Sequence, residues 1–177
     1  TDPEVTVGAD GSVTAVYRYA LPVRPATVCE VAYRVDGSGR VEVTQTMELV
    51  EGLPELPEFG TLLTTADRLD TWRWYGEGPE ESYVDRRRGA RLGVHETDVR
   101  TALTPYLRPQ EAGNRTGVRW AEVTDDRGAG LRFDAEGGME FSALPWTPGE
   151  IEAATHPNLL PPSHRTVLRP ALMRRGV

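Results

Sequence analysis

The chain has 177 residues, of which 38% are hydrophobic, and a chain of this size can bury a sizeable core. We therefore expect residues 1–177 to form a single domain. The formal net charge of −7 argues against a nucleic-acid partner, because phosphate binding requires a concentrated basic face. No apolar run is long enough to cross a bilayer and no signal peptide is evident, so we expect no membrane contact and a cytoplasmic location.

The first third of the chain predicts three strands. Val13–Leu21 alternates apolar and polar residues with a period of two, which is typical of a strand with one buried face. Ala26–Val35 and Val41–Leu49 predict a hairpin, because the Asp36-Gly37-Ser38-Gly39 stretch between them is a strong turn signal. The lone cysteine, Cys29, excludes an internal disulfide and is interpreted as a small buried hydrophobe.

The next segments are interrupted by proline and glycine. Glu51–Gly60 is rich in proline and acid, and predicts a loop along a sheet edge. Strands are expected over Gly60–Thr65 and Leu69–Tyr75. Gly76–Gly93 is expected to be irregular, because its glycines permit backbone angles that other residues avoid.

The second half predicts further β structure. Arg115–Thr124 and Gly130–Ala135 predict a hairpin around Asp125–Gly128, and Glu140–Leu144 predicts another strand.

One helix is expected, over Pro148–His156. Thr147 can cap it, Pro148 suits its first turn, and Glu150 stands at the third position of a capping box. The chain is thus predicted to be mostly β with one short helix.

Candidate catalytic groups are hard to assign from spacing. The three histidines, His95, His156 and His164, are too sparse for a zinc site. Carboxylates are plentiful, and glycoside hydrolysis requires two of them facing each other across a sugar. Spacing in sequence does not establish such a pair, and acids next to arginine usually form ordinary ion pairs. The carboxylates concerned are Glu80, Glu81, Asp85 and Glu111.

A second polar block, Pro105–Arg115, contains an amide, a carboxylate, another amide and a guanidinium: Gln110, Glu111, Asn114 and Arg115. Such groups next to aromatic rings suit the hydroxyls and ring faces of a sugar. They suit equally a buried polar network that braces two sheets. From the residues alone both interpretations stay open.

Several long motifs occur in fixed order. They are Trp74-Tyr75-Gly76-x-Gly78-Pro79-x-Glu81-x-Tyr83-x-Asp85-Arg86, Gly89-Ala90, Pro105-Tyr106, Pro109-Gln110-Glu111-x-Gly113-Asn114-Arg115, Val118-Arg119-Trp120, Gly128-x-Gly130-Leu131 and Phe141-Ser142-Ala143-Leu144-Pro145. In these motifs the chain resembles the C-terminal domain, or small chain, of the large β-galactosidases of glycoside hydrolase family 2. The likeness is strong from about Trp74 to His156 and weaker before it.

The resemblance implies a supersandwich of two large antiparallel sheets packed face to face, as in galactose mutarotase. It implies a parent enzyme that hydrolyses terminal β-D-galactose residues with retention, using two glutamates on a separate TIM barrel. The chain itself would then hold no catalytic residue and no metal, with Mg²⁺ and Na⁺ bound in other domains. Its partners would be the barrel and the other domains of the same enzyme, which is expected to bind a galactoside and to be a homo-oligomer.

The end of the chain resembles the region just before the family's C-terminus. There Val167 or a neighbour stands where the family has a tryptophan that lines the galactose site, so we expect no direct contribution to the catalytic pocket. We hypothesise that six residues converge in one concave patch that serves fold specification, docking or weak sugar contact. They are Tyr83, Asp85, Arg86, Glu111, Asn114 and Arg115.

Two alternatives belong to other functional classes. One is a carbohydrate-binding module that holds a sugar by itself. The other is a mutarotase-like epimerase that uses Glu111 as base and His95 as acid, which requires both groups within hydrogen-bond reach of one sugar.

Overall fold

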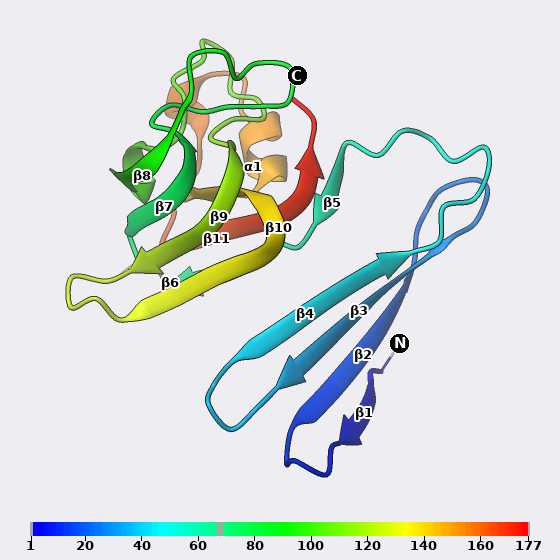
Figure 1. Cartoon of the computed structure of the whole chain (residues 1–177). Coiled ribbons are helices and arrows are strands. Elements are labelled where there is room, and N and C mark those ends of the chain that lie inside the picture. The colour runs from blue at the N-terminus through cyan, green and yellow to red at the C-terminus, as the bar shows by residue number, and fades with distance from the viewer. Residues whose placement is uncertain (1, 67–68, 177) are drawn as a thin grey trace. The chain divides into compact units, whose positions relative to one another are not determined.

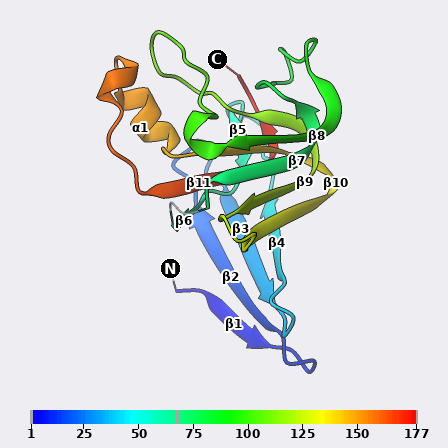
Figure 2. The same ribbon diagram turned by 90° about the vertical axis from the view of Figure 1, so that its left-hand side faces the viewer.

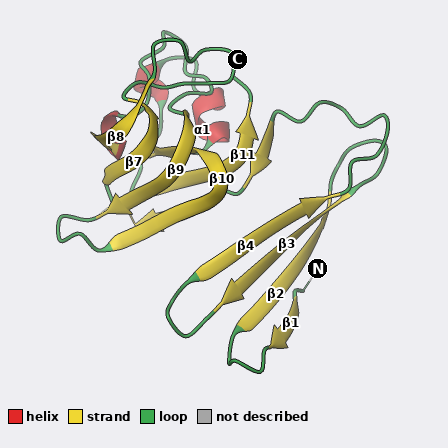
Figure 3. Ribbon diagram, in the orientation of Figure 1, coloured by secondary structure: helices red, strands yellow, loops and turns green. Residues whose placement is uncertain are grey.

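The computed structural model describes residues 2–66 and 69–176. The chain divides into two compact units, Thr1–Leu56 and Pro57–Val177. About half of the residues lie in strands, and the described residues form two antiparallel sheets with one short α-helix (Figure 3). The predicted class, mostly β with two antiparallel sheets, is confirmed. The face-to-face packing of a supersandwich and a single domain over residues 1–177 stay predictions.

The first unit is a four-stranded meander with its strands in chain order, β1-β2-β3-β4. Its strands are β1 (Glu4–Val7), β2 (Val13–Ala20), β3 (Val28–Val35) and β4 (Val41–Met47). The predicted hairpin is confirmed: Gly39 has a φ of 86° and its N–H donates to the carbonyl of Asp36 over 3.2 Å. Cys29 is buried, as expected from its apolar surroundings.

The second unit contains a seven-stranded sheet with the order β5-β11-β10-β9-β7-β8, and β6 also pairs with β11. Its elements are β5 (Glu58–Gly60), β6 (Leu63–Ala66), β7 (Thr71–Gly78), β8 (Arg91–Asp98), a 3₁₀ turn (Val99–Thr101), β9 (Arg115–Thr124), β10 (Gly130–Leu144), α1 (Pro148–Ala153), a second 3₁₀ turn (Pro157–Leu159) and β11 (Arg165–Arg174). Strands β9, β10 and β11 are neighbours in chain order, whereas β9 pairs with β7 and not with β8. Strand β11 lies between β10 and the short strands β5 and β6.

The core of this unit lies on one face of the sheet and is built around aromatic rings. Trp72 and Trp74 are fully buried, with ring centroids 4.6 Å apart, and Phe141 lies 5.7 Å from Trp72. Gly76 and Gly78 continue the same face of β7, where a Cβ on Gly76 would lie 2.8 Å from the Cα of Val118. The Trp-Tyr-Gly-x-Gly motif therefore places large rings in the core and removes side chains where β9 comes close.

The helix begins as predicted but ends earlier. Thr147 Oγ1 accepts the N–H of Glu150 at 3.3 Å, and a Glu150 carboxylate oxygen accepts the N–H of Thr147 at 2.8 Å, so the capping box is confirmed. The helix stops at Ala153 and does not reach His156.

Other predicted boundaries need correction. The irregular segment is residues 79–90, because β7 extends to Gly78 and β8 begins at Arg91. Within the loop predicted over Glu51–Gly60, the last three residues form β5. The two strands predicted after Gly130 are one strand, β10, whose register shifts between Asp134 and Met139 at two glycines of positive φ, so that the apolar pattern breaks without ending the strand.

Candidate functional site

Two acids and two arginines form an ion-pair cluster at the junction of β5, β11 and the loop before β9. Arg169 Nη1 donates to both carboxylate oxygens of Glu111, at 2.9 and 3.2 Å, and its Nη2 pairs with Glu58. Arg174 Nη2 donates to the other oxygen of Glu58 at 2.7 Å. Both arginine side chains are buried, at 5% and 1% exposure, so the cluster survives in low dielectric only because its charges are matched.

Tyr83 closes this Glu58–Glu111–Arg169–Arg174 cluster. Its hydroxyl donates to Glu111 at 3.2 Å and the ring is fully buried. Burial, with the neighbouring carboxylates of Glu111 and Glu81, raises the pKa of Tyr83, so the phenol stays a neutral donor. Although burial alone would raise it, Arg174 and Arg169 hold the pKa of Glu58 below its usual value.

Asn114 extends the cluster across the sheet. Its Nδ2 donates to the carbonyl of Ser82 at 3.0 Å and to Glu140 at 2.6 Å, and its Oδ1 accepts from Arg174 at 2.8 Å. All three groups require the amide in one orientation, so a single residue fixes β9, β10 and β11 relative to the loop at Ser82. Burial raises the pKa of Glu140, against the opposing hydrogen bond from Asn114.

Glu81 organises a second set of contacts, which joins three loop segments. Its carboxylate accepts from Thr104 Oγ1 at 2.6 Å, from the N–H of Gly113 at 2.8 Å and from the hydroxyl of Tyr106. Arg86 donates to the same carboxylate at 2.6 Å from the solvent side. The two polar blocks of the sequence are thus held together by hydrogen bonds, and they lie side by side.

Arg115 points away from this cluster into the aromatic core. Its guanidinium lies over Trp72 and Trp74, at 5.2 and 5.0 Å from the ring centroids, and Nη1 donates to the carbonyls of Gly113 and Asn114. Burial lowers the pKa of Arg115 to about 10, which still leaves it charged at neutral pH. Its place is that of a cation stacked on two indoles.

The last two of the six hypothesised residues lie at the surface. Asp85 and Arg86 are exposed in the turn after Tyr83, where Tyr83 and Arg86 exchange backbone hydrogen bonds of 3.1 and 2.9 Å. The Arg86 guanidinium lies 5.4 Å from the Tyr83 ring centroid. The structure therefore brings together Tyr83, Glu111 and Asn114, joins Arg86 to them through the Tyr83 ring, and directs Arg115 elsewhere. A binding role for the six stays a prediction.

Sequence reasoning missed the arginines that hold these acids. Arg169 and Arg174 are five residues apart on β11, a spacing that places side chains on opposite faces of a regular strand. A register shift between Ala171 and Met173 turns Arg174 back toward Arg169, and no sequence signal marks it. Glu58 was also missed, because it lies in Glu51–Gly60, which was predicted to be a loop.

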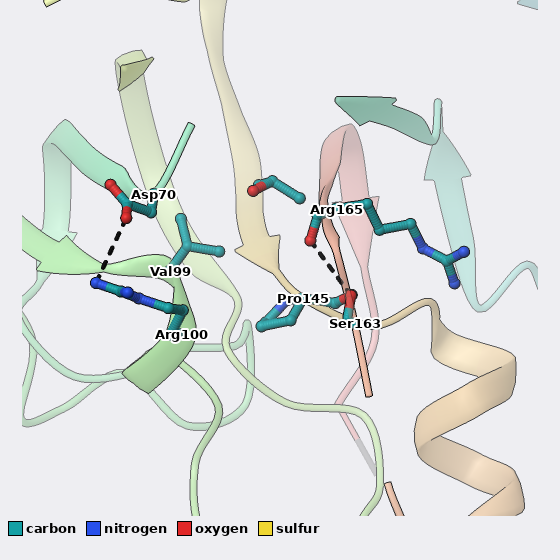
Figure 4. A pocket seen from close by; sticks show the side chains of 7 residues that line it. Asp70, Val99, Arg100, Pro145, Ser163 and Arg165 are labelled. Carbon is teal, nitrogen blue, oxygen red and sulfur yellow. Dashed lines mark hydrogen bonds and ion pairs between the residues drawn. The ribbon is translucent and has the colours of Figure 1, made fainter. Parts of the chain in front are cut away.

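A cavity of about 290 Å³ lies elsewhere in the second unit, and Figure 4 shows its lining residues. They are Asp70, Val99, Arg100, Pro145, Ser163, Arg165 and Thr166. Arg100 pairs with Asp70 at 3.4 Å, and the hydroxyls of Ser163 and Thr166 donate to backbone carbonyls. Thr166 and Arg165 thus have partners outside the lining, Leu69 O and Glu150, and none of the six hypothesised residues lines the cavity.

The groups invoked by the epimerase alternative have separate partners. Glu111 is held by Arg169 and Tyr83, whereas His95 stacks at 5.3 Å on Trp74 and its Nε2 lies 3.0 Å from the carbonyl of Arg91.

Two searches were confined to the described residues. No three His, Cys, Asp or Glu side chains among them gather closely enough to hold a metal ion. No helix within that part of the chain has the length and apolar character that a membrane span requires.

The fold and the cluster define a β-sheet module whose two polar blocks form hydrogen bonds and ion pairs within the module. Residues 2–177 match the family model described as "Beta galactosidase small chain", and the chain belongs to this family. It is 42% identical over 149 residues to a β-galactosidase of Priestia megaterium, covering 84% of this chain and 14% of that protein. It is 39% identical over 178 residues to a β-galactosidase of Streptococcus thermophilus, covering 100% of this chain and 17% of that protein.

A further relative is a separate subunit. The "Beta-galactosidase small subunit" of Latilactobacillus sakei is 34% identical over 176 residues, which cover 93% of this chain and 55% of that subunit. The chain therefore spans less than a fifth of the long β-galactosidases that it matches and about half of the small subunit.

Proposed function

We propose that this chain is a structural part of a β-galactosidase that hydrolyses terminal β-D-galactose residues with retention. The family match over residues 2–177 carries the proposal. In this enzyme the chain supports the rim of the active site and contacts the catalytic barrel. The two catalytic glutamates lie outside these 177 residues. A cytoplasmic homo-oligomer with Mg²⁺ and Na⁺ in other domains completes the proposal.

The contacts of the carboxylates favour a structural role. A retaining glycosidase requires two carboxyl groups about 5–5.5 Å apart, free to face the sugar. Glu58 and Glu111 are paired with buried arginines, and Glu81 accepts four hydrogen bonds. A carboxylate so saturated is a poor nucleophile and a poor proton donor.

The length of the relatives agrees with catalysis by a domain other than this chain. Because the chain corresponds to only 14–17% of two long β-galactosidases, most of such a polypeptide is available for a catalytic domain. The role that we assign to the Glu58–Glu111–Arg169–Arg174 cluster is to hold β5, β11 and the loop before β9 in one arrangement against that domain.

The test is a comparison of two forms of the polypeptide that carries this chain. With the chain present, we expect hydrolysis of a galactoside; with residues 57–177 deleted, we expect activity to be lost. Titration calorimetry with galactose on the isolated chain separates the alternatives, since a carbohydrate-binding module gives saturable heat and a structural part gives none. Mutarotation of galactose by the isolated chain would favour the epimerase.

A further inference from the structure

The face of the seven-stranded sheet opposite the Trp72–Trp74 core carries two ordered rows of side chains. Strands β8, β7, β9 and β10 lie side by side in this order (Figures 1 and 2). Directly opposed residues of antiparallel neighbours share a face, so the registers define the rows. The first row is Glu96, Arg73, Glu122 and Arg132, and the second is Val94, Tyr75, Trp120 and Asp134. We call these eight residues the β8–β10 face.

The first row alternates acid and base across all four strands. Arg132 pairs with Glu122 at 2.6 Å and with Asp134 at 2.9 Å, while remaining about half exposed. Arg73 and Glu96, at the other end of the row, are exposed and have no ion-pair partner among the described residues. The row thus presents fixed charges of alternating sign, of which two are available to another molecule.

The second row is apolar and aromatic at its centre. Trp120 lies beneath two guanidinium groups, with Arg132 at 4.9 Å and Arg73 at 5.8 Å from a ring centroid. Val94, next to Tyr75, is 54% exposed. Tryptophan, tyrosine and arginine are the residues enriched where protein interfaces gain most of their binding energy.

The order of the charges makes this face complementary to itself. A two-fold axis that runs parallel to the strands, between β7 and β9, reverses each row and lays it over its own copy. Glu96 then faces Arg132 of the second copy, and Arg73 faces Glu122. In the second row the same operation lays Tyr75 over Trp120 and Val94 over Asp134, so the complementarity comes from the first row and from the two central rings. An isologous interface requires this kind of self-complementarity.

We propose that the β8–β10 face binds a second copy of this chain, through that two-fold arrangement. The occupant follows from the charge order, because an acid–base–acid–base row read backwards is its own complement, whereas a row of one sign would repel itself. The inference rests on the homo-oligomer of the proposed function and deepens it, since it names the face through which two copies meet. A monomeric chain would overturn this inference without touching the hydrolysis assay that tests the proposed function. The net charge of −7 on each copy opposes association, so the matched rows must outweigh a general repulsion.

The test is sedimentation equilibrium of the purified chain at concentrations up to roughly 0.3 mM, a range that detects a weak dimer. The wild-type chain is expected to reach twice the 19.5 kDa of one copy. Arg73→Glu places like charges opposite each other at two symmetric positions, and should weaken the dimer by about tenfold or more. Arg127→Glu, in the exposed β9–β10 turn, makes the same charge change outside the face and should leave the dimer unchanged.

A compensating variant decides between loss of pairing and loss of fold. Arg73→Glu with Glu122→Arg swaps the two central charges, so the two positions still face each other across the axis with opposite signs. Within the sheet each then lies beside one like charge, Glu96 or Arg132, so the fold of this variant is checked by its circular dichroism spectrum. This double variant should regain the wild-type dimer. A wild-type chain that stays monomeric overturns the proposal and leaves the face to solvent or to another part of a longer polypeptide. A folded double variant that stays monomeric, or an Arg73→Glu chain that dimerises like the wild type, overturns it equally.

Discussion

Replacing Arg174 by methionine tests the buried cluster at its most enclosed point. The side chain is 1% exposed and donates four hydrogen bonds: to Glu58 at 2.7 Å, Asn114 at 2.8 Å, Arg169 O at 3.0 Å and Ser142 Oγ at 3.1 Å. Methionine fills much of the same volume but donates none of them. Glu58, Asn114 and Ser142 therefore lose a partner while staying largely buried.

The expected cost is about 3 kcal/mol of unfolding free energy. Removing one partner of a buried ion pair typically costs about 3–5 kcal/mol, because the other charge is left uncompensated. The lower end applies here, since Glu58 keeps Arg169 as a partner and is 27% exposed, so water screens part of the loss.

The measurement is urea unfolding followed by tryptophan fluorescence, which reports on Trp72 and Trp74 in the same unit. The control is Arg87→Met, which removes an exposed partner of Glu77 and should cost less than about 1 kcal/mol. A cost for Arg174→Met as small as that of the control would refute the reasoning that the cluster stabilises the fold.

Three further predictions concern single residues. Thr147→Ala removes the helix cap and should lower the unfolding free energy by about 1 kcal/mol, whereas Thr147→Ser should retain it; urea melts compare them. Arg115→Lys should lower the unfolding free energy by about 2 kcal/mol, because an ammonium does not stack on the two indoles as a planar guanidinium does, and a urea midpoint equal to that of the wild type would contradict this. Glu140→Gln should stabilise the chain at pH 7, because the raised pKa of Glu140 means that its ionised form is disfavoured in the folded state. That gain should vanish as the pH falls below the ordinary pKa of 4.5, and a gain independent of pH would argue against it.

The parts of the fold that local chemistry decides were predicted well. The Asp36–Gly39 turn and the Thr147–Glu150 capping box each need only neighbouring residues, so the sequence contains all of the information. Strand β9 was predicted with its observed boundaries. Buried and more exposed residues alternate along most of it, so its apolar pattern follows the core.

Strand β8 was not predicted, and the reason is its place at the sheet edge. Only one of its sides is paired, and Leu92 and Val94 are each 54% exposed, so its alternation does not follow a buried face. A strand held mainly by hydrogen bonds to its neighbour leaves a weak pattern in its own residues.

The cluster was predicted only in part, because its partners are distant in sequence. Glu111 and Asn114 belong to the Pro109–Arg115 motif and were predicted as site residues. Glu58 was not, because it is 111 residues from Arg169 and 116 from Arg174. Long-range pairing of this kind depends on the strand order and on the register shift in β11, neither of which a local pattern contains.

The most direct measurement of the central claim is a galactosidase assay on the purified 177-residue chain alone, with a chromogenic galactoside at saturating concentration. If the chain is a structural part whose carboxylates are occupied by internal pairing, the rate stays at that of the buffer blank. Release of the chromophore above the blank, abolished by Glu111→Gln or Glu81→Gln in a chain that still folds, would contradict the account.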